Sequence, residues 1–142
     1  MSDTSQPCAC LVPSNFVNMK VLRRPGEKTK VFIRFVGTNC CDVSVDKYLN
    51  TMREVYAEKS LFLVLYDATQ VGRLPLTTIN KVASFMRTFD ASTRLYLKGC
   101  AIVLSSEWAK ASLNVLFTLK PPACPLQTFT SVDEAKLWLR HV

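Results

Sequence analysis

The stretch Leu61-Phe62-Leu63-Val64-Leu65-Tyr66, which ends at Asp67, decides the fold. An unbroken apolar run of this length, with no polar alternation, indicates a strand buried inside a sheet. Cys100 to Leu104 has the same character, and Leu126 to Phe129 is a third, shorter candidate strand. Helical patterns separate these strands, so we expect them to pair in parallel.

On the N-terminal side of this stretch the sequence predicts a hairpin. Apolar and polar residues alternate from Phe16 to Arg23, and a second strand is expected from Thr29 to Gly37. Arg24-Pro25-Gly26-Glu27 lies between them and is typical of a tight turn, because proline presets one central angle and glycine accepts a positive φ. The two strands should therefore be antiparallel.

The segments between and after the strands are predicted helices. Ser44 is expected to cap the first, and Thr77 or Thr78 the second. Ser105 and Ser106 are expected to cap the third, which extends from Ser106 to Leu119 and ends before Pro121-Pro122. Ser131, with Glu134, forms a capping box that opens the last helix. Their apolar faces carry Val45, Leu49, Met52 and Tyr56, then Ile79, Val82, Met86 and Phe89, and finally Val132, Ala135, Trp138 and Leu139.

The predicted order ββαβαβαβα defines a single α/β domain with a mainly parallel, mixed sheet and an N-terminal hairpin. With 142 residues, of which 49% are hydrophobic, the chain can bury one core. We expect residues 1–14 to form a loosely held arm and residues 15–142 to form the domain. No signal peptide or membrane-spanning stretch is recognisable, so a cytoplasmic protein is expected.

The positive charge is concentrated in the predicted hairpin. The formal net charge is +7, and between Met19 and Arg34 only Glu27 opposes the basic residues Lys20, Arg23, Arg24, Lys28, Lys30 and Arg34. Such a cluster attracts anionic membranes or acidic partners, or it keeps a sheet edge solvated. Few aromatic residues are interleaved with it, so nucleic acid is not an expected partner.

The sequence offers little catalytic chemistry. It has no CxxC pair, its only histidine is the penultimate His141, and phosphate-binding glycine motifs are absent. We therefore expect neither a metal nor a cofactor, and free thiols, with adventitious oxidation or a redox role left open for Cys40 and Cys41. Asp67 is the best single candidate acid, although its simpler role is to bind backbone amides of the following loop. The chain is not expected to be an enzyme.

Two features point to binding. In the helix from Ser106 to Leu119, Lys110, Asn114 and Thr118 form one narrow polar stripe, and most of the remaining surface is apolar. This surplus is either buried by ordinary packing or binds a partner or an acyl chain. The start of the second helix is the other feature, because free backbone N–H groups there favour an anion or a phosphorylated threonine.

The order and spacing of these segments resemble the STAS domain (sulfate transporter and anti-sigma factor antagonist) from Phe16 to Leu139. The resemblance is carried by residues 61–67 with the loop and helix after them, by residues 113–129 and by residues 131–139. It implies a regulatory module that binds proteins, nucleotides or lipids without catalysis. The loop that is phosphorylated on serine in anti-sigma factor antagonists corresponds here to residues 75–78, where Thr77 or Thr78 would replace the serine. A more distant likeness is to CRAL-TRIO lipid-binding domains.

We therefore expect a non-catalytic protein-interaction module, with a second copy of the chain among the candidate partners. Its binding surface is predicted at Thr69, Gly72, Arg73, Pro75, Thr77, Thr78 and Lys81. The alternative is a protein that binds a lipid or another hydrophobic ligand. That surface is predicted at Trp108, Leu113, Leu116 and Phe117, together with the basic residues Arg23, Arg24 and Lys28.

Overall fold

The structure is a computed structural model that describes residues 17–35, 42–71 and 74–142. Its five-stranded sheet has the order β2-β3-β4-β5-β6. The antiparallel pair β2–β3 forms the hairpin, and β3, β4, β5 and β6 pair in parallel. The strands are β2 (Val17–Leu22), β3 (Thr29–Phe35), β4 (Phe62–Ala68), β5 (Leu97–Leu104) and β6 (Leu126–Phe129). The mixed α/β architecture predicted from the sequence is confirmed.

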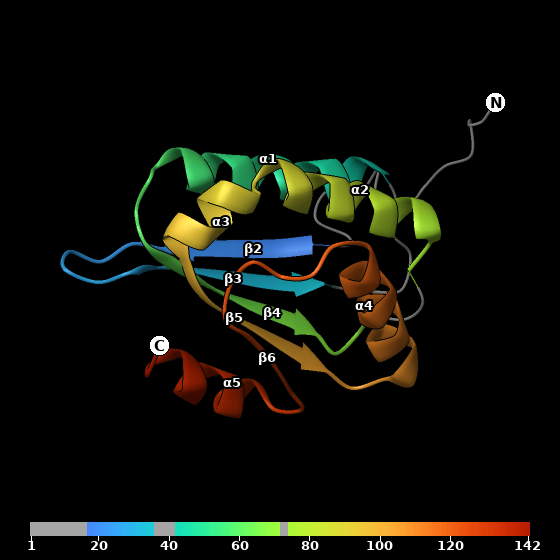
Figure 1. The fold of residues 1–142 in the computed structure, drawn as a ribbon. Helices are drawn as coiled ribbons and strands as arrows, with labels where there is room; N and C mark the ends of the chain where they lie inside the picture. The colour runs from blue at the N-terminus through green and yellow to red at the C-terminus, as the bar shows by residue number, and fades with distance from the viewer. Residues whose placement is uncertain (1–16, 36–41, 72–73) are drawn as a thin grey trace.

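Because the strand order never reverses, the helices that connect the parallel strands share one face of the sheet. A right-handed crossover places its helix on a face set by the direction in which the next strand is added, and that direction is constant here. Figure 1 shows α1, α2, α3 and α4 on one side and α5 on the other. The helices are α1 (Asp42–Ala57), α2 (Leu76–Thr88), α3 (Asp90–Tyr96), α4 (Glu107–Leu119) and α5 (Val132–Leu139).

The local signals at several ends of elements behave as predicted. Gly26 has a φ of +78°, and the amide of Glu27 donates to the carbonyl of Arg24 over 3.1 Å, which closes the predicted turn. The Ser106 hydroxyl accepts from the amide of Ala109, and that of Ser131 accepts from the amide of Glu134. These caps satisfy amides that a helix cannot satisfy internally.

Two helix starts differ from the prediction. The helix α1 begins at Asp42, so Ser44 lies inside its first turn and not before its first residue. The N-cap of α2 is Pro75, whose side chain makes no capping bond, and neither Thr77 nor Thr78 occupies that position. Tertiary packing explains the second difference, because Thr78 is only 6% exposed and is drawn into the core.

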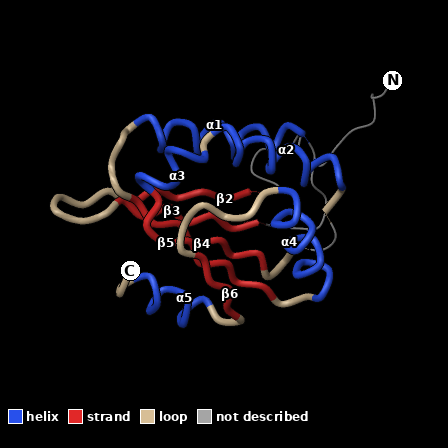
Figure 2. Tube along the Cα trace, viewed as in Figure 1, coloured by secondary structure: helices blue, strands red, loops and turns tan. Residues whose placement is uncertain are grey.

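The core lies on both sides of the sheet (Figure 2). On the α5 side, Leu63, Leu65, Ala101 and Val103 pack against Ala135 and Leu139. On the other side, α1, α2 and α3 cover one part of the sheet and α4 covers another. Cys100 is buried on this side, as the sequence predicted, while Cys8, Cys10, Cys40, Cys41 and the arm of residues 1–14 lie outside the described residues.

Candidate ligand-binding site

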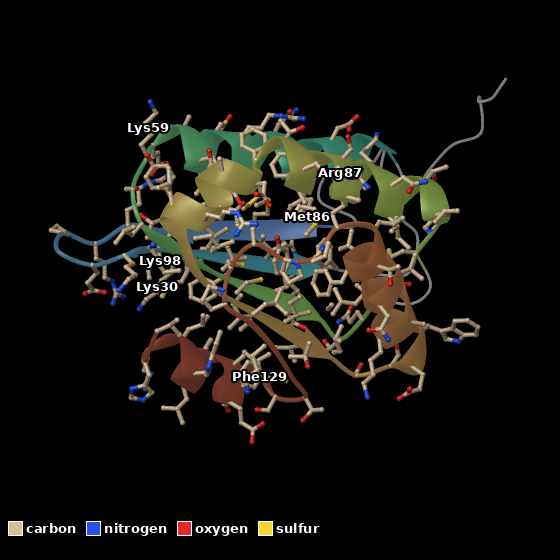
Figure 3. The ribbon with its side chains drawn as sticks, in the orientation of Figure 1. Lys30, Lys59, Met86, Arg87, Lys98 and Phe129 are labelled. Carbon is tan, nitrogen blue, oxygen red and sulfur yellow. The ribbon has the colours of Figure 1, made fainter. Side chains whose placement is uncertain are left out.

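A cavity of about 200 Å³ lies between the sheet and helices α1, α2 and α4. Its lining is mostly aliphatic and aromatic, because alternate residues of β4 and β5 point toward this face. Figure 3 shows Met86 pointing from α2 toward the sheet and the segment that leads into β6. The sheet contributes Tyr66, Cys100 and Ile102, α1 contributes Tyr48 and Met52, α2 contributes Ile79 and Met86, and α4 contributes Leu113, Leu116 and Phe117.

Hydroxyl groups provide most of the polarity inside this cavity. The phenol oxygens of Tyr48 and Tyr66 lie 2.6 Å apart and share a hydrogen bond. Removal from water raises the pKa of both phenols well above the ordinary value. Tyr56 and Thr93 form a similar hydroxyl pair at 2.7 Å, and burial raises the pKa of Tyr56 to about 12. These phenols stay neutral at physiological pH, so they can hydrogen-bond a ligand but add no charge.

Two thiols also border the cavity. Cys100 on β5 and Cys124, just before β6, are hydrogen-bonded to each other, and both are free cysteines. This bond and burial raise the pKa of Cys100. The same bond, with a smaller contribution from Lys120, lowers the pKa of Cys124 despite its partial burial. Cys124 is therefore the thiol of this pair that ionises first.

Lys120 is the charged residue of the lining, among the residues that the structure describes. It forms the C-cap of α4, and its ammonium lies 2.7 Å from Asp90 Oδ1 at the start of α3. Asp90 Oδ2 accepts a hydrogen bond from Arg94 over 2.8 Å. The ion pair with Lys120 and the hydrogen bond from Arg94 lower the pKa of the Asp90 carboxyl. A mostly apolar cavity therefore has one lysine among its described lining residues, and this lysine is in an ion pair with Asp90.

The structure divides the residues predicted for hydrophobic-ligand binding. Leu113, Leu116 and Phe117 line the cavity, whereas Trp108 is 58% exposed and lies outside the lining. The basic residues Arg23, Arg24 and Lys28 belong to the hairpin, which projects from the end of the sheet opposite α4 (Figure 1). The apolar residues of α4 and the basic residues of the hairpin therefore do not form one binding surface.

The residues predicted for partner binding are also separated. Pro75 and Thr77 are exposed, but Thr78 is buried and lines the cavity. Thr69 is half-buried, and its carbonyl accepts a hydrogen bond from Ser105 over 2.6 Å. Lys81 pairs with Asp46 of α1 at 3.0 Å. Gly72 and Arg73 lie outside the described residues.

Asp67 has the simpler of its two predicted roles. Its Oδ1 accepts from the amide of Thr69 over 3.1 Å and from the Thr69 hydroxyl over 2.7 Å. The carboxylate thus holds the loop after β4 in place. No cluster of histidine, cysteine and acidic residues suited to a metal ion occurs within residues 17–35, 42–71 and 74–142.

The cavity could not be predicted as a binding site from the sequence. Its lining extends from Val17 to Leu126, and periodicity along one element does not report how elements far apart in sequence close over the sheet. The surplus of apolar residues on α4 was the available signal. Lys120 stands beside two prolines after an apolar helix, and this pattern is too common to indicate a site.

This architecture, with a hairpin followed by alternating helices and strands and a final helix on the opposite face, is that of a STAS-like domain. Among solved structures the chain is similar to an uncharacterized protein of the DUF3478 family from Shewanella loihica PV-4, which has a SpoIIAA-like fold. The TM-score is 0.60 at 16% sequence identity, and the match covers 87% of this chain and 94% of that one. The resemblance predicted from the sequence is confirmed at the level of the fold.

The chain itself belongs to a family described as a domain of unknown function, DUF7793, whose model matches residues 27–142. A search of curated protein sequences found no match. None of the helices in the described part of the chain has the length and apolar run that a membrane-spanning helix requires.

Proposed function

We propose that this STAS-like protein is a non-catalytic module that binds a small hydrophobic molecule between its sheet and the layer formed by α1, α2 and α4. The observation that carries the proposal is the cavity of about 200 Å³ with its mostly apolar lining. Protein interiors are packed to about 0.75 of their volume, and voids larger than a water molecule are few. An apolar void of this size favours a hydrophobic occupant over water.

The strand order supports this position for a ligand. In α/β sheets whose strand order reverses, ligands bind in a crevice at the point of reversal. The strands of the described residues run from β2 to β6 without reversal, so they offer no such crevice. The space between the sheet and the helical layer is the alternative position that the geometry provides.

A filling substitution on α4 tests the proposal. Leu116 lines the cavity and is half-buried, whereas the next residue, Val115, is 42% exposed and lies outside the lining. We expect 1-octanol, titrated by calorimetry, to bind the unmodified protein and the control Val115→Trp with equal affinity. Leu116→Trp should weaken binding about tenfold or more, because the indole takes the space of the ligand. Equal binding by all three proteins, or binding by none, would contradict the proposal.

A second candidate function is protein interaction, and a specific surface favours it. The side chains of Trp108, Val115 and Leu119 lie on one side of α4 at helical spacing and are 58%, 42% and 38% exposed. Exposed apolar stripes of this kind mark interaction surfaces. In the simplest form of this proposal, the stripe pairs with a second copy of the chain.

Sedimentation velocity at increasing protein concentration tests that form. Trp108→Ser should lower the self-association of the protein, and Leu137→Ser is the matched control, because Leu137 is 53% exposed on α5. A monomer at all concentrations, or an equal effect of both substitutions, would exclude pairing through α4.

A further inference from the structure

We propose that the molecule held in the cavity is a single-chain carboxylic acid, whose tail lies among the apolar residues and whose carboxylate binds the ammonium of Lys120. This inference rests on the proposed function and specifies the ligand class. It follows from the chemistry of the lining, the hydrogen bonds of Lys120 and the size of the cavity.

The lining of the cavity is mostly apolar, and the charge that its described residues carry is positive. Within the described part of the chain, Lys120 is the only charged residue that borders the cavity, and the other polar side chains of the lining carry hydroxyl or thiol groups. Its side chain is only 15% exposed, which is low for a lysine. A ligand whose tail occupies the cavity therefore meets a cation at its border, and an anionic group complements it.

The hydrogen bonds of Lys120 leave room for this anion. Its ammonium donates to the carbonyl of Pro121 over 2.7 Å and lies 2.7 Å from Asp90 Oδ1. A lysine ammonium has three donors, so the hydrogen bond to Pro121 and the ion pair with Asp90 leave at least one N–H for a ligand. If the ammonium turned away from Asp90, Arg94 would still hold that carboxylate through Oδ2. Binding a carboxylate at Lys120 therefore leaves no buried charge without a partner.

The charges around the cavity border also favour an anion. Arg87 at the end of α2 donates to the carbonyl of Leu119 over 3.2 Å, next to Lys120. Arg87 and Lys120 thus offset the negative end of the α4 dipole, which would otherwise repel a carboxylate. In the cluster of Arg87, Asp90, Arg94 and Lys120, the cations outnumber the carboxylate.

The size of the cavity sets the length of the tail. An engineered cavity of about 150 Å³ accommodates benzene, with its six carbons. The present cavity of about 200 Å³ fits a single chain of medium length and is too small for a lipid with two long chains. Octanoate is therefore the probe that matches both the tail and the head group.

Calorimetry at pH 7 with octanoate, 1-octanol and octylamine tests the inference. We expect octanoate to bind the unmodified protein about tenfold or more tightly than 1-octanol, because a hydrogen bond to a charged group is stronger than a neutral one. Octylamine should bind most weakly. Lys120→Met should reduce octanoate binding to the level of 1-octanol and leave 1-octanol binding unchanged.

Two further variants control for structural damage. Lys110→Met removes an exposed lysine of the same helix, outside the cavity, and should leave all affinities unchanged. Asp90→Asn leaves Lys120 in place and removes its anionic competitor, so octanoate should bind equally well or more tightly. Equal affinities for octanoate and 1-octanol, or an unchanged preference in Lys120→Met, would overturn the inference while leaving the proposed function standing. Binding of neither compound would instead contradict the proposed function itself.

Discussion

The two faces of the sheet are packed differently. On the α5 face, small residues meet: Ala101, Val103 and Ala135 have no exposed surface. Phe129, shown beside α5 in Figure 3, packs against Trp138 with 5.8 Å between the ring centres. On the opposite face, larger side chains from α1, α2 and α4 leave a cavity above Tyr66 and Cys100. A single short helix lies close to the sheet over small residues, whereas several crossover helices must share a face and cannot close over all of it.

Paired leucine truncations should show the largest difference between the faces. Leu65→Ala, on the α5 face, should lower the free energy of unfolding by about 3 kcal/mol, because it leaves a new cavity in a packed core. Leu113→Ala, on the opposite face, should cost only about 1 kcal/mol, because this half-buried side chain already borders empty space. Urea denaturation of both variants measures the difference, and equal costs would mean that the cavity is closed in solution.

Substitutions that enlarge a side chain should show a difference in the same direction, with the α5 face again the more sensitive, but a smaller one. Ala135→Leu on α5 should destabilise the protein by about 2 kcal/mol, because no space separates Ala135 from the sheet. Leu116→Trp should change the free energy of unfolding by less than about 1 kcal/mol, since the cavity accommodates the larger ring. A larger loss for Leu116→Trp than for Ala135→Leu would contradict the difference between the two faces.

The tyrosine pair allows a finer test of the cavity face. Tyr66→Phe removes the hydrogen bond to Tyr48 and leaves that phenol without this partner. We expect a loss of about 1 kcal/mol in the free energy of unfolding, measured by urea denaturation. An unchanged or higher stability would indicate that the two phenols are not bonded to each other in solution.

The smallest predicted effect is a difference in thiol reactivity. Because the pKa of Cys124 is lowered and that of Cys100 is raised, Cys124 forms its thiolate at the lower pH. Alkylation by iodoacetamide, followed by peptide mass mapping, should show that Cys124 is modified before Cys100. The rate at Cys124 should already rise with pH at values below the ordinary pKa of a thiol. Saturating 1-octanol should slow this reaction. Faster modification of Cys100 would contradict the assigned order of the two thiol pKa values.

Structural features that a few neighbouring residues determine could be predicted from the sequence, whereas features that depend on distant parts of the chain could not. The turn at Gly26 and the caps at Ser106 and Ser131 are set by a few neighbouring residues, and all three were predicted correctly. The start of α2 was predicted wrongly, because burial of Thr78 is a tertiary effect. The cavity depends on how several helices meet over the sheet, so only the part of its lining on α4 could be predicted from the sequence.

A methyl-resolved NMR titration with 1-octanol tests the central claim most directly, because it reports on both faces in one experiment. We expect shifts for methyl groups that line the cavity, such as those of Ile102, Leu113 and Leu116. We expect no shifts for Leu63, Leu65 and Val103 on the α5 face. Shifts on both faces, shifts confined to exposed residues such as Leu76 and Leu137, or no shifts at all would contradict a ligand-binding cavity beneath α4.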